Sequence, residues 1–148
     1  MPDALRADRT HVFPVRVYYE DTDAGGVVYH ANYLRFAERA RSEMLRALGI
    51  PHTQMLRDDG LAWTVSRCEV DFVQPARLDD ALEVHSRVLE LGGASLWAEQ
   101  IVRRDNHDCA RLKLRLACVD RAGRPARLPE NVRAALAPAK PPKARKRA

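Results

Sequence analysis

The chain has 148 residues, of which 46% are hydrophobic and 30% are charged, and its formal net charge is +5. This length and composition predict one globular domain that buries its core without disulfides or a structural metal. No apolar run approaches the roughly 20 residues of a membrane span. The N-terminus lacks the apolar stretch of a signal peptide, so we expect a soluble cytoplasmic protein.

The three cysteines, Cys68, Cys109 and Cys118, form an odd set without C-x-x-C spacing. An odd number of cysteines without that spacing suggests neither a disulfide framework nor a zinc knuckle. The histidines other than His30 have no ligand spacing either. We therefore expect buried, reduced thiols and no metal site.

The positive charge belongs to the C-terminal tail. The last nine residues contain no acid and five basic residues, Lys140, Lys143, Arg145, Lys146 and Arg147. Without these five, 20 basic residues balance 20 acidic ones, so we expect no specific nucleic-acid site. The predicted organisation is a flexible lead over residues 1–10, one domain over 11–137 and a disordered tail over 138–148. The tail offers at most weak attraction to a membrane surface or to nucleic acid.

Residues 11–20 predict a first strand, because apolar and polar side chains alternate there. One face of this predicted strand carries Phe13, Val15, Val17 and Tyr19. Pro14 favours a position at the start of a strand or at the edge of a sheet.

The segment that follows concentrates reactive groups just before a helix. It contains three acids, two glycines and a histidine: Glu20, Asp21, Asp23, Gly25, Gly26 and His30. A carboxylate that faces backbone amides at a helix start suits acyl chemistry, because those amides lack intrahelical acceptors and favour negative charge. The alternative is a loop acid that caps the helix or forms an Asx turn. A calcium loop is excluded because Asn32 stands where a bidentate glutamate is needed.

Residues 31–48 predict a long amphipathic helix, since apolar side chains recur at helical spacing. Gly49 suits the position after its last residue, and Pro51 prevents continuation. At about 1.5 Å per residue the helix is roughly 27 Å long, enough to cross a sheet. Residues 52–59, closed by Gly60, predict a short helix or irregular turn.

The rest of the chain is rich in strands. Residues 61–72 change apolar phase near Ser66-Arg67, which predicts a bulge. Residues 81–91 and 94–103 predict a hairpin around Gly92-Gly93, and residues 110–118 alternate cleanly as a last strand. A short helix is expected over 129–136. One helix followed by four antiparallel strands predicts an α+β fold.

Residues 15–45, with the segment Tyr19 to Tyr33 at their centre and Glu38-Arg39-Ala40-Arg41 downstream, closely resemble the YbgC branch of the hotdog-fold acyl-CoA thioesterases. These are relatives of 4-hydroxybenzoyl-CoA thioesterase. The likeness continues through Pro75 to Asp80 and the strand beginning at Gly93, and covers about residues 11 to 130. It implies a hotdog fold, in which a five-stranded antiparallel sheet wraps the long helix. It also implies a homodimer or homotetramer whose sheets join edge to edge, with active sites at the interface.

The resemblance places the catalytic carboxylate on Asp23, as a general base or as a nucleophile, and the oxyanion donor on the backbone N–H of His30. The His30 side chain matches the YbgC branch, and its role is open: it orients water, binds the carbonyl or holds Asp23. Asp21 either shapes the loop or acts on Asp23 through its like charge. Glu38 is a secondary candidate, because some other hotdog thioesterases carry their acid on this helix.

Substrate contacts are expected from both sides of the loop. Gly25 and Gly26 allow the thioester to approach the backbone, and Tyr29 and Tyr33 either line an acyl pocket or, for Tyr33, belong to the core. Ser95 resembles a hydroxyl that the partner subunit presents near the thioester; the alternative is a hydroxyl at a strand start. The cations on the last strand, Arg111, Lys113 and Arg115, are either a solvated face or a site for CoA phosphates.

The function that this implies is hydrolysis of an acyl-CoA, or of an acyl group on a carrier protein, to free acid without a cofactor. The alternative is a hotdog scaffold that acts mainly in protein or membrane association, linked by the resemblance to the Tol-Pal envelope system.

Overall fold

The computed structural model describes residues 5–139, so most of the predicted basic tail lies outside the described residues. The sheet strands are β1 (His11–Arg16), β2 (Ala62–Phe72), β3 (Ala81–Leu91), β4 (Ser95–Arg104) and β5 (His107–Val119). The helices are α1 (Asn32–Ala47), α2 (His52–Asp59) and α3 (Glu130–Leu136), with a 3₁₀ turn, η1 (Tyr19–Asp21), before α1. In the described part of the chain no helix has the length and apolar character needed to cross a bilayer.

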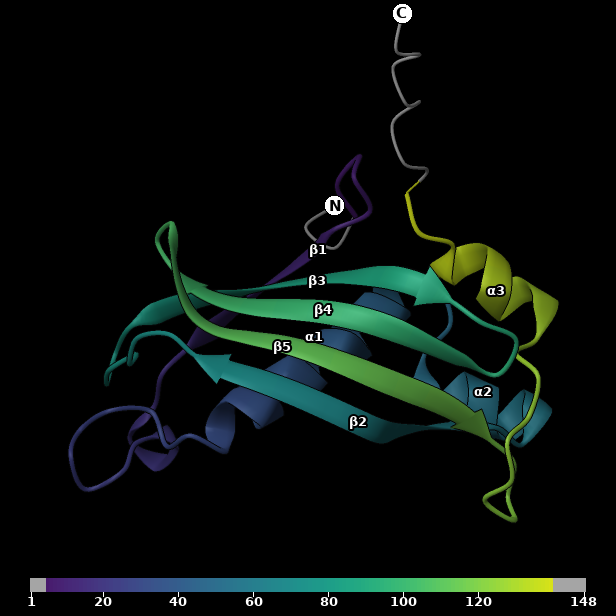
Figure 1. Cartoon of the computed structure of the whole chain (residues 1–148), viewed down its shortest axis with the longest axis horizontal. Coiled ribbons are helices and arrows are strands. Elements are labelled where there is room, and N and C mark those ends of the chain that lie inside the picture. The colour runs from purple at the N-terminus through teal and green to yellow at the C-terminus, as the bar shows by residue number, and fades with distance from the viewer. Residues whose placement is uncertain (1–4, 140–148) are drawn as a thin grey trace, which may run out of the picture.

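The strands form one antiparallel sheet in the order β1-β3-β4-β5-β2, and α1 lies against one face of it (Figure 1). The predicted α+β arrangement and the hairpin between β3 and β4 are therefore confirmed. The predicted bulge is also present, because the β2–β5 register shifts between Val65 and Arg67.

The core lies between α1 and the sheet, where the helical spacing of the sequence placed it. Tyr33, Phe36, Ala37, Ala40 and Met44 of α1 are buried, and the helix packs chiefly against β1, β3 and β4. The alternating residues of β5 face the same core; they are Ala110, Leu112, Leu114, Leu116 and Cys118. α3 closes the far end of the core with Val132 and Leu136.

Two expectations from the sequence are wrong. The first strand ends at Arg16 and the chain then turns into η1, so Tyr19 leaves the buried face and is 83% exposed. Cys68 is exposed on β2, whereas Cys109 and Cys118 are buried as expected. The reason for the second error is that β2 lies at the edge of the sheet, whereas α1 packs chiefly against β1, β3 and β4.

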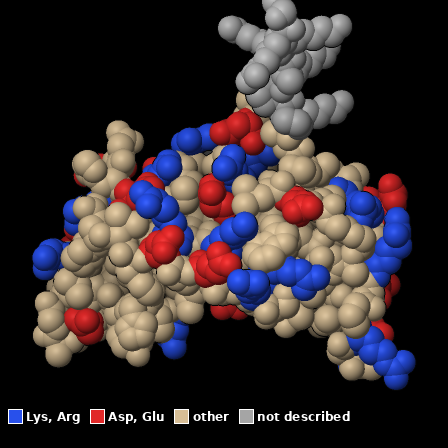
Figure 2. Space-filling view, in the orientation of Figure 1, with Lys and Arg blue, Asp and Glu red and all other residues tan. Residues whose placement is uncertain are grey.

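The face of the sheet turned away from α1 carries charges of both signs (Figure 2). The three cations predicted on the last strand lie there and each has a contact within the chain. Arg111 Nε lies 2.8 Å from Asp108 Oδ2, and Lys113 Nζ lies 5.0 Å from the ring centre of Trp97. Arg115 donates to Ser66 Oγ at 3.0 Å. These contacts support the solvated-face interpretation over a phosphate site.

The ion pairs of Asp108 predict a pH-dependent contribution to stability. Hydrogen bonds from Arg111 and Arg103 outweigh burial and hold the pKa of Asp108 below its ordinary value of 3.8. A carboxyl whose pKa is lower in the folded state stabilises the fold above the unfolded-state pKa, and this contribution is lost as the pH falls through the folded-state pKa. Asp108→Asn should lower the free energy of unfolding near neutral pH by about 1 kcal/mol or less.

Urea denaturation of the wild type and of Asp108→Asn at about pH 7 and about pH 2.5 measures this difference. The gap should close at the acidic pH. A gap of equal size at both values would contradict the ion-pair explanation.

Candidate active site

The loop between η1 and α1 is a small hairpin that presents Asp23. Thr22 and Val28 form a bridge, Asp23 N–H donates to Val27 O at 2.8 Å, and Gly26 N–H donates to Asp23 O at 3.0 Å. Gly26 has a φ of +79°, a conformation that favours glycine. A Cβ on Gly25 would lie 3.2 Å from Asp23 Oδ1. The two glycines are therefore required by the turn and by the space around Asp23.

The Asp23 carboxylate is exposed and has spare acceptor capacity. Its Oδ1 accepts the Gly25 N–H at 2.8 Å, which is the Asx turn of the alternative interpretation. No other hydrogen bond reaches this carboxylate from residues 5–139. The Asx turn thus orients the group and leaves Oδ2 free for a ligand.

Asp23 and His30 line one open pocket of about 290 Å³. The other lining residues come from the loop, from α1 and from the end of β2: Val27, Val28, Tyr33, Phe72, Val73, Gln74 and Pro75. The pocket is therefore an apolar hollow with one carboxylate at its side. Its volume is close to the lower end of the range for small-molecule sites, about 300 Å³.

His30 stands immediately before α1, and two amides there are unused. The backbone N–H groups of His30 and Ala31 donate to no acceptor within the described residues, and no side chain caps this helix. The exposed His30 ring contacts Tyr29 at 4.5 Å and Phe72 at 6.2 Å between centroids. Free N–H groups at a helix start favour a negatively charged oxygen.

The three acids of the loop occupy different environments. Glu20 is exposed, whereas Asp21 is only 5% exposed and accepts hydrogen bonds from Tyr18 N–H and Asn32 Nδ2, each at 2.8 Å. The first of the two roles considered for Asp21, shaping the loop, is the one these contacts support. Asp23 is thus the acid that faces the pocket.

The two tyrosines predicted near the acyl group differ in burial. Tyr29 is 45% exposed beside His30, whereas Tyr33 is 3% exposed and its hydroxyl accepts the Ala76 N–H at 3.0 Å. Burial raises the pKa of Tyr33. Tyr33 therefore belongs to the core, as one alternative proposed, and also gives one side of its ring to the pocket.

Ser95 does not lie at this pocket. It pairs with Ala117, which also pairs with Thr64 of β2, eight residues from Phe72 at the pocket. At about 3.3 Å per residue this separation is roughly 26 Å. Within one chain, Ser95 Oγ accepts a hydrogen bond from Arg115 Nη2 at 3.2 Å.

The end of β2 was not anticipated as part of the site. Phe72, Val73 and Gln74 reach the pocket because β2 runs along the edge of the sheet toward the start of α1. The alternation of residues 61–72 identifies Phe72 as an inward side chain, but strand order is needed to place it beside His30. The loop is also tied to the next segment, since Val28 N–H donates to Ala76 O at 2.8 Å.

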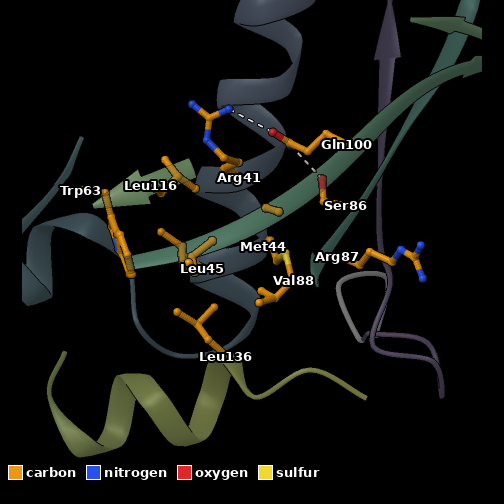
Figure 3. Close-up of a pocket in the computed structure, with 12 residues that line it drawn as sticks. Arg41, Met44, Leu45, Trp63, Ser86, Arg87, Val88, Gln100, Leu116 and Leu136 are labelled. Atoms are coloured by element: carbon orange, nitrogen blue, oxygen red, sulfur yellow. Dashed lines mark hydrogen bonds between the residues drawn. The ribbon is translucent and has the colours of Figure 1, made fainter. Parts of the chain in front are cut away.

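A second cavity lies farther along α1, between the helix and the sheet (Figure 3). It measures about 40 Å³ and is walled by apolar side chains such as Leu45, Trp63 and Leu116. That volume holds a few waters at most and is too small for an acyl chain. At its rim Arg41 Nη1 donates to Gln100 Oε1 at 2.9 Å. We therefore do not assign this cavity as a substrate site.

Residues 17–136 match the Thioesterase-like superfamily. The chain belongs to this superfamily. The protein named acyl-CoA thioesterase YbgC from Haemophilus influenzae is 45% identical over 130 residues, which cover 87% of this chain and 96% of that protein. Acyl-CoA thioester hydrolase YbgC from Escherichia coli O157:H7 is 46% identical over 73% of this chain and 81% of its own length.

Among solved structures, a probable thioesterase from Bartonella henselae matches with a TM-score of 0.78 and 38% sequence identity. The match covers 81% of this chain and 99% of that one. The expected resemblance to the YbgC branch of the thioesterases and the expected hotdog fold are therefore confirmed. The roles of the individual site residues of this thioesterase-like chain stay predictions.

The Tyr33 hydroxyl predicts a local stability effect at the site. Tyr33→Phe removes the acceptor of the Ala76 N–H, which lies beside the loop. Leaving a buried donor unsatisfied costs about 1–3 kcal/mol. Chemical denaturation should show a loss of this size. Tyr29→Phe is the matched control, because the Tyr29 hydroxyl makes no hydrogen bond within residues 5–139 and its loss should change stability little.

Proposed function

We propose that this thioesterase-like protein hydrolyses an acyl-CoA to a free acid and CoA, with Asp23 as base or nucleophile and the His30 N–H as oxyanion donor. The observation that supports this most directly is the placement of a free carboxylate oxygen on a pocket whose wall includes His30, at a helix start with unused amides. The names of the YbgC relatives support acyl-CoA as the substrate class.

Thioester hydrolysis requires few catalytic groups. An attacking oxygen must reach the carbonyl carbon, and the oxyanion must be stabilised while the C–S bond is intact. The thiolate then leaves readily, since a thiol has an ordinary pKa near 8.5. One carboxylate is enough, either taking a proton from water or forming a mixed anhydride that water then hydrolyses. In both routes water supplies the oxygen of the free acid. One proton of this water ends on the departing thiolate, and the other stays with the product acid.

The pocket suits an uncharged acyl chain better than a charged group. Its walls are chiefly apolar and aromatic, with Phe72 and Tyr33 at 5.9 Å between ring centroids. We propose an acyl-CoA or an acyl carrier protein as donor, no cofactor and action in the cytoplasm. A panel of short, long and aromatic acyl-CoAs, assayed by trapping the released thiol, defines the acyl preference.

Asp23→Asn tests the catalytic assignment. The asparagine Oδ1 keeps the acceptor for the Gly25 N–H, so the loop and the fold should survive. Loss of the carboxylate should lower kcat by about 10²–10⁴-fold, the usual contribution of a general base. Thiol release from the best acyl-CoA of the panel measures kcat.

Glu20→Gln is the matched control, because it removes an exposed acid three residues away that makes no hydrogen bond within residues 5–139. It should keep wild-type turnover. Near-normal kcat in Asp23→Asn would overturn the assignment. If wild-type protein releases no CoA from any acyl-CoA, the association scaffold becomes the better hypothesis.

We also propose that two copies join through β2 and that the partner completes the site. β2 spans 11 residues and, within residues 5–139, pairs only with β5, so one of its edges is unpaired in the described part of the chain. A long unpaired edge is a template for pairing with another strand. The inward apolar side chains of β2 support this, since Val65 is 45% and Phe72 is 56% exposed.

Antiparallel pairing of two β2 edges brings opposite ends of the strands together. The Thr64 end of one copy then lies beside the Phe72 end of the other. Because Ser95 is two strands from Thr64, this arrangement moves the partner's copy of the Ser95 region toward the Asp23 pocket. The distance that separates Ser95 from the pocket within one chain therefore agrees with a role contributed in trans.

Val65→Lys tests the dimer. The side chain is half-exposed in the single chain, so the lysine should leave the monomer folded, whereas pairing would bury its ammonium group in the apolar contact between the two strands. The variant should sediment as a monomer and lose most turnover. Thr64→Lys, one residue earlier on the outer face, is the matched control and should remain an active dimer. An active monomeric Val65→Lys would contradict completion of the site by the partner.

A further inference from the structure

Asp21 and Asn32 join the two parts of the proposed active site through one buried contact. Asp21 Oδ1 accepts a hydrogen bond from Asn32 Nδ2 at 2.8 Å, and the two residues are 5% and 7% exposed. We infer that this Asp21–Asn32 pair is a positioning device that sets the Asp23 loop against the first turn of α1. The inference rests on the proposed function, because it concerns the geometry of that site.

Asp21 closes the base of the loop with all of its polar groups. Its N–H donates to Tyr18 O at 3.0 Å and its carbonyl accepts the Tyr29 N–H at 2.9 Å. The second carboxylate oxygen, Oδ2, accepts the Tyr18 N–H at 2.8 Å. The hairpin over residues 22–28, which carries Asp23, therefore lies between Asp21 and Tyr29, and these two residues are hydrogen-bonded to each other.

Asn32 is the first residue of α1, directly after the unused N–H groups of His30 and Ala31. Its own N–H donates to Tyr29 O at 2.8 Å, and both Tyr29 and Asn32 are hydrogen-bonded to Asp21. The contact between Asp21 and the Asn32 side chain fixes the orientation of the helix start relative to the loop. The Asp21–Asn32 pair thus positions both the Asp23 loop and the proposed oxyanion donors.

This pair differs from a contact that only stabilises the fold. Both Asp21 oxygens face N–H donors, so neither is available to a substrate, and Asp21 acts through Asp23 and His30 rather than on the thioester. A displacement of about 1 Å between attacking and stabilising groups can cost about 10²-fold in rate. The pair should therefore affect kcat more than KM.

Asn32→Asp is the decisive variant, because it places a carboxylate where Asp21 needs a donor. It should lower kcat by about 10–100-fold, with KM changed by less than about threefold. Asp21→Asn alone should be mild, since the Asn32 amide can turn and present its oxygen to the new donor. In the double variant Asp21→Asn/Asn32→Asp, the amide at 21 donates to the acid at 32 and still accepts the Tyr18 N–H. The kcat of the double variant should be at least about tenfold higher than that of Asn32→Asp.

Asn32→Ala keeps the test decisive if Asn32→Asp does not fold, because it removes the donor without adding a charge. Like Asn32→Asp, it should lower kcat. Asn106→Asp, in the exposed turn between β4 and β5, adds the same charge far from the loop and should keep wild-type kcat and KM.

Rates are expressed per folded protein, with thermal denaturation measured for each variant. The inference is overturned if the wild type hydrolyses acyl-CoA while Asn32→Asp or Asn32→Ala keeps wild-type kcat and loses only thermal stability. It is also overturned if the double variant is no more active than Asn32→Asp. Failure of the proposed function would give a different result, because the wild type itself would then release no CoA.

Discussion

The packing of α1 against one part of the sheet is the constraint on which the rest of the molecule depends. The helix is anchored by a fully buried polar side chain: Gln100 Nε2 donates to Ala37 O at 2.8 Å and to Ser86 Oγ at 2.9 Å. A buried amide with its partners in place specifies one rotation of the helix on the sheet. That rotation places α1 chiefly over β1, β3 and β4 and sets its first turn at the end of β2, where Phe72 lies.

Three acids within four residues are tolerable here because each has a different environment. Glu20 is solvated, Asp21 is bonded to two N–H donors, and Asp23 is held by one N–H in an open pocket. Like charges this close would otherwise oppose one another. The unused amides at the start of α1 also favour negative charge nearby. The loop thus combines Asp21, whose carboxylate holds the loop in place, with Asp23, whose carboxylate the proposed chemistry uses, at the same end of the helix.

Elements governed by local periodicity were predictable from the sequence. The core face of α1, the inward row of β5 and the bulge at Val65 all follow from spacing that the sequence displays directly. The errors concern tertiary neighbours. Tyr19 fits the period of β1, yet the chain has already turned into η1. Cys68 fits an inward position, yet it is exposed because β2 lies at the edge of the sheet. Phe72 was missed at the site because strand order, not strand pattern, brings it beside His30.

The small number of groups at the pocket follows from the ease of the reaction. A thiolate leaves without a positioned acid, so a site for thioesters can consist of an attacking oxygen, an oxyanion donor and a wall that orders the acyl group. In the proposed function, Asp23 and the His30 N–H supply the first two, and the single chain forms only part of the wall. The inward side chains of β2 that would continue the wall, Val65 and Phe72, end in solvent. If two copies pair through β2 as proposed, the same strand edge both joins the subunits and completes the wall of the pocket, so self-association and completion of the site occur together.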